Sequence, residues 1–321
     1  MKLLITGCAG FIGFNYCLKR LSKKDKNLKI IGIDNLNNYY STKIKKDRLN
    51  LLKKHKNFQF YKINIDNKIK LEKIFKKNKI DIIIHLAAQA GVGYSLINPE
   101  QYLKSNTNGF FNILEAAKNY KIRKILYASS SSVYGDSKKF PLKENMYIKP
   151  LNFYGLTKKN NEEMAEIYGN FYGVKSIGLR FFTVFGEWGR PDMVILKMIN
   201  SIYKKTNFYL NNKGNHYRDF TYINDVVKII DKLLRKNFKK KHFVVNICSN
   251  KPLKITILLN LAKKFNLKLK YRLRGFQKVD ILKTHGCNKL VKKVTGINNF
   301  TKFEVGFLKT LNWYKKYNKI Y

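Results

Sequence analysis

The chain has 321 residues, of which 45% are hydrophobic, and this is enough for one large domain or two modest ones with buried cores. Its 65 lysines and arginines outnumber its 20 aspartates and glutamates, which gives a formal charge of +45. A protein that binds nucleic acid or a membrane surface is expected to cluster such charge, whereas here lysine is spread along the whole chain. We therefore expect a lysine-rich solvated surface that favours anionic ligands, and no nucleic-acid partner.

Two further features restrict the class of protein. The four cysteines, Cys8, Cys17, Cys248 and Cys287, are scattered without the spacing of a disulfide framework or a zinc site. No apolar run reaches the roughly 18 residues that a membrane span needs. The sequence therefore predicts a cytoplasmic protein without membrane insertion and without a bound metal.

Short apolar runs alternate with segments of helical spacing. The predicted strands are, in chain order, Lys2–Thr6, Lys29–Asp34, Phe58–Ile65, Ile80–Leu86, Ile125–Ser129 and Lys175–Phe181. The helical segments between and after them include Phe11–Leu21, Ile69–Lys76, Tyr102–Asn119 and Lys158–Tyr172. This alternation predicts an α/β fold with a doubly wound parallel sheet, and strands that are apolar throughout are typical of a sheet covered on both faces.

A glycine triplet follows the first predicted strand and opens the first helix. The sequence from Gly7 to Gly13 is GCAGFIG, in which Gly7 allows a tight turn, Gly10 lets a pyrophosphate approach the backbone, and Gly13 lets the helix pack on the strand. Asp34 ends the second strand about 20 residues later, where a carboxylate accepts both ribose hydroxyls and repels a 2′-phosphate. This arrangement predicts NAD as the cofactor, rather than NADP; the alternative is a glycine turn with a capping aspartate.

A tyrosine and a lysine with Y-x-x-x-K spacing are the candidate catalytic pair. Tyr154 and Lys158 would share one face of a helix, and a nearby cation lowers the pKa of a phenol, which makes it a usable base. A run of serines, 129–132, ends the fifth strand at the edge where such sheets bind ligands. We expect Ser130 to orient the substrate hydroxyl that Tyr154 deprotonates. The alternatives are a surface tyrosine beside a solvated lysine, and a polar loop.

Together these motifs, with His85-Leu-Ala-Ala-Gln89, resemble the extended short-chain dehydrogenases that act on nucleotide sugars, over essentially the whole chain. Three stretches resemble UDP-glucuronate 4-epimerases in particular: DNLNNYY at 34–40, AQAGVGYS at 88–95 and RFFTVFGEWGRPDM at 180–193. The resemblance implies an NAD-dependent enzyme that inverts C4 of a UDP-sugar through a 4-keto intermediate, and a homodimer formed through a helix pair. Residues 1–180 would be the NAD-binding Rossmann domain, which receives some later strands, and residues 181–321 mainly a smaller substrate-binding lobe.

The same resemblance implies the site residues. Those on NAD would be Gly7, Gly10, Phe11, Ile12, Gly13, Asp34, Asn35, Asn37, Asn64, Ile65, Leu86, Ala87, Ala88, Asn106, Tyr154, Lys158 and Phe181. Ala87 and Asn106 would contact the nicotinamide half, and Asn64 stands where the family usually has an aspartate that meets the adenine amine. Those on the UDP-sugar would be Ser131, Ser132, Thr183, Arg190, Arg218 and Asp280, with Arg218 and Asp280 on the uridine diphosphate and its ribose.

Some positions depart from the family pattern and keep alternatives open. Gly93 stands where the family usually has arginine, Val279 where it has glycine, and Gly155 where it has alanine. The missing arginine leaves a UDP-hexose 4-epimerase as an alternative. A 4,6-dehydratase usually carries an Asp-Glu pair at the positions of Ser131 and Ser132, and a UDP-glucuronate decarboxylase usually carries glutamate at the second. An NAD-sensing binding module without turnover would be expected to lack the tyrosine or the lysine.

Overall fold

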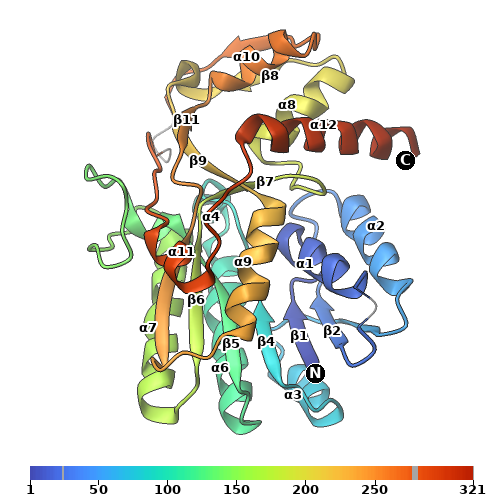
Figure 1. The fold of residues 1–321 in the computed structure, drawn as a ribbon, viewed down its shortest axis with the longest axis vertical. Coiled ribbons are helices and arrows are strands. Elements are labelled where there is room, and N and C mark those ends of the chain that lie inside the picture. Colours follow the sequence, from blue (N-terminus) through green and yellow to red (C-terminus); the bar gives the residue numbers. More distant parts are fainter. Residues whose placement is uncertain (24, 277–280, 321) are drawn as a thin grey trace.

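The largest element of the fold is a seven-stranded sheet, seen in Figure 1. The computed structural model describes residues 1–23, 25–276 and 281–320. The strand order is β10-β6-β5-β4-β1-β2-β3, and each neighbouring pair is parallel. From β1 the chain continues to β2 and β3 on one side of the sheet and then to β4 and β5 on the other, so the direction of strand addition reverses at β1. Open parallel sheets bind ligands at such a reversal, beyond the carboxyl ends of the strands. The predicted α/β fold class is confirmed.

The six strands predicted from apolar runs are all present, the first two with the predicted bounds and the other four with shifted ends. The strands of the sheet are β1 (Lys2–Thr6), β2 (Lys29–Asp34), β3 (Phe58–Lys62), β4 (Ile82–His85), β5 (Lys124–Ser130), β6 (Ser176–Phe181) and β10 (His242–Ile247). The helices packed around it are α1 (Phe11–Leu21), α2 (Thr42–Lys53), α3 (Lys68–Lys77), α6 (Gly109–Asn119), α7 (Phe153–Tyr172) and α9 (Ile223–Arg235). Thus β10 and α9, which come from the second half of the chain, complete the sheet layer.

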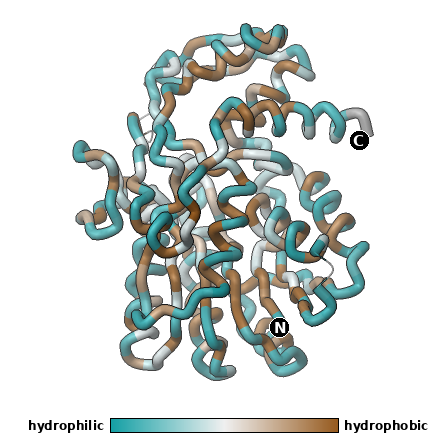
Figure 2. Tube along the Cα trace, in the orientation of Figure 1, coloured by the Kyte–Doolittle hydropathy of each residue, from teal (hydrophilic) through white to brown (hydrophobic). Residues whose placement is uncertain are grey.

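Successive residues of a strand point to opposite faces, and here both faces are buried. On β1, Leu3 and Ile5 join a core that includes residues of α1, α2 and α9, whereas Leu4 joins a second core with residues of α3, α6 and α7. All three side chains are fully buried. Figure 2 shows hydrophobic residues along the central strands and hydrophilic ones on the outer loops. The sheet is therefore held rigidly between two apolar layers, which fixes the positions of its carboxyl ends.

A smaller lobe lies beyond the carboxyl ends of the strands, at the top of Figure 1. Its strands are β7 (Thr183–Phe185), β8 (Phe208–Leu210), β9 (Tyr217–Tyr222), β11 (Pro252–Lys254) and β12 (Tyr271–Leu273), and its helices are α8 (Val194–Tyr203), α10 (Ile257–Lys264) and α12 (Phe303–Ile320). The strands form a β11-β9-β7 sheet and a β12-β8 pair. A further helix, α11 (Lys289–Thr295), packs on α9 and β10.

One predicted helix is wrong in detail. The segment Tyr102–Asn119, expected to be continuous, is instead a short helix α5 (Pro99–Tyr102), a π-helical turn over Leu103–Asn108, and then α6. A helix α4 (Tyr94–Ile97) precedes them. The wider turn is a local choice of hydrogen bonds that helical periodicity does not reveal, and such turns are frequent at functional sites. In the part of the chain that the structure describes, no helix combines the length and apolar character needed to cross a bilayer.

Candidate active site

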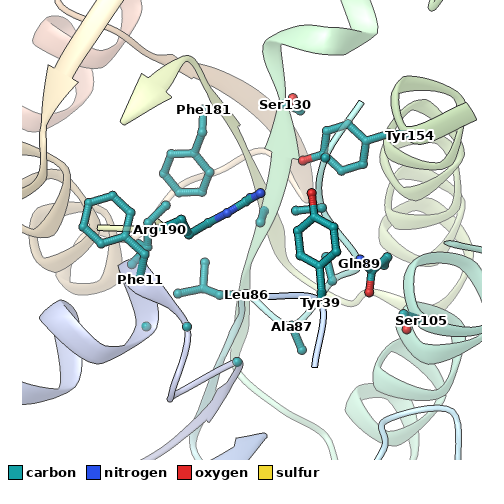
Figure 3. Close-up of a pocket in the computed structure, with 18 of the residues that line it drawn as sticks. Phe11, Tyr39, Leu86, Ala87, Gln89, Ser105, Ser130, Tyr154, Phe181 and Arg190 are labelled. Atoms are coloured by element: carbon teal, nitrogen blue, oxygen red, sulfur yellow. The ribbon is translucent and has the colours of Figure 1, made fainter. Parts of the chain in front are cut away.

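A cavity of about 420 Å³ opens at the carboxyl edge of the sheet and is bounded on its other side by the smaller lobe. This volume lies within the roughly 300–1,000 Å³ of small-molecule sites. Every predicted site residue lines it except Asn106 and Asp280, and Asp280 lies outside the described residues. Figure 3 shows Tyr154, Ser130 and Tyr39 on one side of the cavity, with Phe11, Phe181 and Arg190 on the other. The fold thus brings together segments that are far apart in the sequence.

The glycine loop is shaped by backbone crowding. Gly7 has φ +71°, and a Cβ built on it would lie 2.8 Å from the backbone nitrogen of Ala87. A Cβ on Gly13 would lie 2.2 Å from the carbonyl oxygen of Gly7. Only glycine permits this approach of loop, helix and neighbouring strand. Helix α1 has no acidic residue in its first turn, so its N-terminal N–H groups and partial positive charge are available to a pyrophosphate.

Asp34 ties the glycine loop to the second strand. Its carboxylate accepts hydrogen bonds from the backbone nitrogens of Ala9 (3.1 Å) and Leu36 (2.8 Å), and it also lines the cavity. Burial raises the pKa of Asp34, while the bond from Leu36 and the charge of Lys45 act in the opposite direction. A carboxylate has about four acceptor positions, so the two that remain are sufficient for a ribose diol.

The ends of β2 and β3 are joined by two asparagines. Asn35 Nδ2 donates to Asn64 Oδ1 at 2.5 Å, so the amide oxygen expected to face adenine already accepts one bond and retains its second lone pair. Lys45 Nζ donates to both the carbonyl and the side-chain oxygen of Asn37, each at 2.6 Å. Burial lowers the pKa of Lys45 to about 8, against the attraction of Asp34. This buried cation was not expected from the sequence.

Asn106 lies behind the cavity wall and does not line it. The residue is 0% exposed. Its side-chain oxygen accepts a bond from the backbone nitrogen of Gln89 at 2.8 Å, and its side-chain nitrogen donates to the carbonyl oxygen of Gln89 at 3.0 Å and to the Thr157 hydroxyl at 3.1 Å. Asn106 therefore holds the loop after β4, and its contact with nicotinamide stays a prediction. Gln89 itself lines the cavity, and its buried amide nitrogen has no hydrogen-bond partner among the described residues.

Helix α7 positions the predicted catalytic pair, Tyr154 and Lys158. Asn152 caps it by accepting from the backbone nitrogen of Gly155 at 2.8 Å, which places Tyr154 in the first turn. A Cβ on Gly155 would lie 2.7 Å from the carbonyl oxygen of Ser132, so glycine at this position lets the helix approach the serine turn, residues 131–134. Lys158 is fully buried, and its Nζ donates to the carbonyl oxygen of Ala128 at 2.9 Å.

The electrostatics of Tyr154 differ from the prediction. Burial raises its pKa, and the groups that act in the opposite direction are the Ser130 hydroxyl and the Arg190 guanidinium, rather than Lys158. The reason is geometric, because Lys158 Nζ binds the Ala128 carbonyl and lies 5.9 Å from the centre of the tyrosine ring. Burial also lowers the pKa of Lys158 to about 8, while Glu162 raises it. The positive charge of a bound oxidised nicotinamide would lower the pKa of Tyr154 further.

The comparisons with known proteins agree with this geometry. Residues 3–248 match the model of the NAD dependent epimerase/dehydratase family. The chain belongs to this family. Its cofactor is NAD, and the predicted resemblance to nucleotide-sugar epimerases is confirmed.

Relatives match along almost the whole chain. A protein of Methanocaldococcus jannaschii is 43% identical over 98% of this chain and 96% of its own length. A UDP-glucuronate 4-epimerase of Thermodesulfobacterium geofontis is 36% identical, over 98% and 96%. A crystal structure of UDP-glucuronic acid 4-epimerase from Bacillus cereus, in complex with UDP-glucuronic acid and NAD, superposes with a TM-score of 0.92 at 26% identity, covering 99% of this chain and 100% of that one.

The substrate side of this epimerase-family cavity carries hydroxyls and two guanidinium groups. Ser131, Ser132 and Thr183 line it. Arg190 is bound by Asp192, and Arg218 Nη1 donates to the carbonyl oxygen of Tyr217 at 2.9 Å. In the described ranges, no group of three or more His, Cys, Asp or Glu side chains is arranged to hold a metal ion.

Sequence reasoning gave no role to several residues of the cavity. Tyr39 and Gln89 line it and lie within stretches that resemble the family, but the pattern alone assigned them no contact. Conversely, Gly93 is exposed and does not line the cavity, and a Cβ there would meet nothing within 4 Å. The Cβ position of residue 93 therefore does not contact the wall of the cavity.

The crowding at Gly13 gives a first prediction. Gly13→Ala is expected to push the loop away from helix α1 and weaken NAD binding by about tenfold or more, since such overpacking costs on the order of 1–3 kcal/mol. Gly93→Ala is the matched control, because its Cβ has open space. The dinucleotide that copurifies is released by denaturation and quantified by mass spectrometry. Equal NAD content in the two variants would contradict the role of the loop.

The buried ammonium gives a second prediction. The folded-state pKa of Lys158 is about 8, below the ordinary 10.5, so the unfolded chain binds this proton more tightly. The resulting cost to stability is present at pH 7 and is relieved as pH rises from 8 toward 10.5. Lys158→Met is therefore expected to lose turnover but to raise the free energy of unfolding at pH 7 by about 1–2 kcal/mol. This figure allows for the cost of leaving the Ala128 carbonyl without its partner. At pH 10 the gain in stability is expected to be smaller.

Urea unfolding at the two pH values measures this effect. The control is Lys159→Met, on the more exposed side of the same helix, which is expected to change stability by no more than about 0.5 kcal/mol. A Lys158→Met variant that is less stable than the wild type at pH 7 would show that the ammonium contributes more than it costs.

Proposed function

We propose that this protein is a UDP-glucuronate 4-epimerase, which interconverts UDP-glucuronate and UDP-galacturonate with NAD. The observation that carries the proposal is the pairing of a cavity-facing Tyr154 and Ser130 with hydroxyls, rather than carboxylates, at Ser131 and Ser132. The relatives of Thermodesulfobacterium geofontis and Bacillus cereus described above bear this activity in their names and align along nearly the whole chain.

The site can carry out a reversible oxidation at C4. When bound by the glycine loop and Asp34, NAD would supply the hydride acceptor for C4 and, after the keto sugar has turned over, the hydride donor. Tyr154 would accept the proton of the C4 hydroxyl and later return it to the C4 oxygen, and Ser130 would hold that oxygen in line. The Ser130 hydroxyl and the Arg190 guanidinium favour the phenolate form by lowering the pKa of Tyr154. Lys158 is held at the Ala128 carbonyl, 5.9 Å from the centre of the tyrosine ring.

Retention of carbon dioxide requires a particular grip on the substrate. A 4-keto uronate is a β-keto acid, and it loses carbon dioxide readily when the C5–C6 bond stands perpendicular to the ketone plane. Hydroxyl donors at Ser131, Ser132 and Thr183 can hold the carboxylate away from that geometry without transferring protons. A glutamate at position 132 would repel the carboxylate, and the serines cannot supply the acid and base that a dehydratase needs.

The charges of the cavity favour a uronate over a neutral hexose. Its lining contains two guanidinium groups, those of Arg190 and Arg218. Arg218 lies on β9, where its Nη1 donates to the carbonyl oxygen of Leu282 at 3.3 Å, and the resemblance assigns Arg218 to the uridine diphosphate. Arg190 is left for the sugar, and one guanidinium is sufficient to bind a carboxylate through two hydrogen bonds. The resemblance gave Asp280 a role on the uridine diphosphate and its ribose, and we retain that role as part of the proposal.

We also propose a cytoplasmic homodimer. The cysteines are four buried free thiols, as a reducing compartment favours. Helices α6 and α7 pack side by side and present large exposed apolar side chains. They are Phe111, Leu156, Ile167, Phe171 and Tyr172, with Phe171 79% exposed. Leu156, Ile167 and Phe171 recur at helical spacing along one stripe of α7, and a patch of this kind favours an interface.

The dimer is tested at that stripe. The double variant Ile167→Glu, Phe171→Glu is expected to halve the mass measured by light scattering, because four buried charges would face one another across a symmetric interface. Ile69→Glu is the control, since Ile69 is equally apolar and 70% exposed on α3. A wild-type monomer, or a variant that remains dimeric, would place the interface elsewhere or exclude it.

The activity is tested with UDP-glucuronate and analysis of the products by NMR. UDP-galacturonate is the expected product, and Tyr154→Phe is expected to retain NAD while turnover falls by about 10²–10⁴. Tyr147→Phe is the control, because Tyr147 is 84% exposed and outside the cavity lining. A UDP-pentose as the main product would indicate a decarboxylase, and turnover of UDP-glucose alone would indicate a hexose epimerase.

A further inference from the structure

The arginine of the sugar site is already paired with an acid. Arg190 donates from Nε to Asp192 Oδ1 at 3.0 Å and from Nη2 to Asp192 Oδ2 at 2.5 Å. A guanidinium has five N–H groups, so this bidentate pair uses one edge and leaves three donors on the other. In Figure 3 the guanidinium extends from the side of Phe181 toward Tyr39 and Tyr154. Asp192 therefore fixes the plane of the guanidinium and determines which edge faces the ligand.

A tyrosine from the cofactor side holds this ion pair. Tyr39 lies between β2 and α2, on the loop that follows Asp34 and also carries Asn37. Its hydroxyl donates to Asp192 Oδ2 at 3.3 Å, and its ring centre lies 5.6 Å from Arg190 Cζ. The loop that is predicted to bind NAD therefore reaches across the cavity to the group predicted to bind the sugar.

The position of Tyr39 is closely constrained. Gly91 has φ +108°, and a Cβ there would lie 2.1 Å from the Tyr39 hydroxyl oxygen, so a side chain at this position would displace the phenol. The ring of Tyr94 packs on that of Tyr39 with centres 5.0 Å apart. Tyr94 and Gly91 belong to the segment that follows β4, and this segment is anchored by Asn106 through Gln89. Tyr39 is thus held from two sides.

We infer that Asp192 and Tyr39 are positioning residues that limit how strongly Arg190 binds the carboxylate of a uronate, an inference that rests on the proposed function. The keto sugar must turn over between two hydride transfers, so its carboxylate has to be released and bound again. A guanidinium that is already neutralised by Asp192 binds a second carboxylate less strongly than a free one does. The Arg190–Asp192 pair thereby orients the carboxylate of the uronate without binding it so tightly that the sugar cannot turn over.

The decisive variant is Asp192→Asn, which keeps the shape and removes the charge. With its partner neutral, Arg190 is expected to bind UDP-glucuronate about tenfold more tightly, the effect of roughly one charge-assisted interaction, while UDP-glucose binding stays unchanged. The kcat with UDP-glucuronate is expected to fall about tenfold as the sugar turns over more slowly. Tyr39→Phe removes only the hydroxyl and is expected to shift both quantities in the same direction by about threefold.

Titration calorimetry with UDP-glucuronate and with UDP-glucose measures the two dissociation constants. The controls are Asp136→Asn, which removes an exposed acid paired with Lys138, and Tyr147→Phe. Unchanged UDP-glucose binding shows that the variants are folded. Equal effects on the two ligands, weaker UDP-glucuronate binding, or no effect would each overturn the inference. The turnover of the wild-type protein tests the proposed reaction. The ratio of the two dissociation constants tests the inference, and it does so even if UDP-glucuronate is bound but not converted.

Discussion

The structure of the catalytic centre depends on keeping one ammonium charged inside a dry protein. Lys158 is buried at the carboxyl edge of the sheet, and burial alone disfavours its charged form. The Ala128 carbonyl on β5 binds the ammonium directly, and Glu162, one helical turn further along α7, provides a balancing negative charge. One partner comes from β5, which α7 packs against, and the other from α7 itself, so the position of α7 and the charge of the lysine depend on each other.

The balancing carboxylate is itself fixed by a network that crosses the sheet. Glu162 accepts two bonds from Arg180 on β6, at 2.9 and 2.8 Å, and a third from the Ser129 hydroxyl at the end of β5. Arg180 also donates to the Tyr134 hydroxyl, which bonds Asn246 on β10. A buried pair of this kind adds little net stability, but breaking it would leave an uncompensated charge. This network therefore holds α7, β5, β6 and β10 in the one arrangement that places Tyr154 at the cavity.

Local patterns predicted much of the fold and the cofactor side of the site, because strands, the glycine turn and Asp34 depend on neighbours in the sequence. Contacts between distant segments were not predictable in the same way. The bond from Tyr39 to Asp192 spans 153 positions, and no spacing rule connects these residues. Asn106 was assigned to nicotinamide by resemblance, and its bonds to the backbone of Gln89 have no sequence signal. The pKa of Tyr154 was predicted with the wrong direction because its burial was not visible in the motif.

The large positive charge of the chain and the sparse charge of its cavity have different consequences. A formal charge of +45 attracts an anionic nucleotide sugar from a distance, and solution ions screen that attraction at the surface. Three cations of the cavity lining have an acid close by: Lys45 lies near Asp34, Arg190 is bound to Asp192, and Lys158 lies near Glu162. Local pairing therefore determines how the ligand is held once it arrives. A surface that gathers anions can coexist with a site that must release and rebind one in every catalytic cycle, because the two properties depend on different residues and different dielectric surroundings.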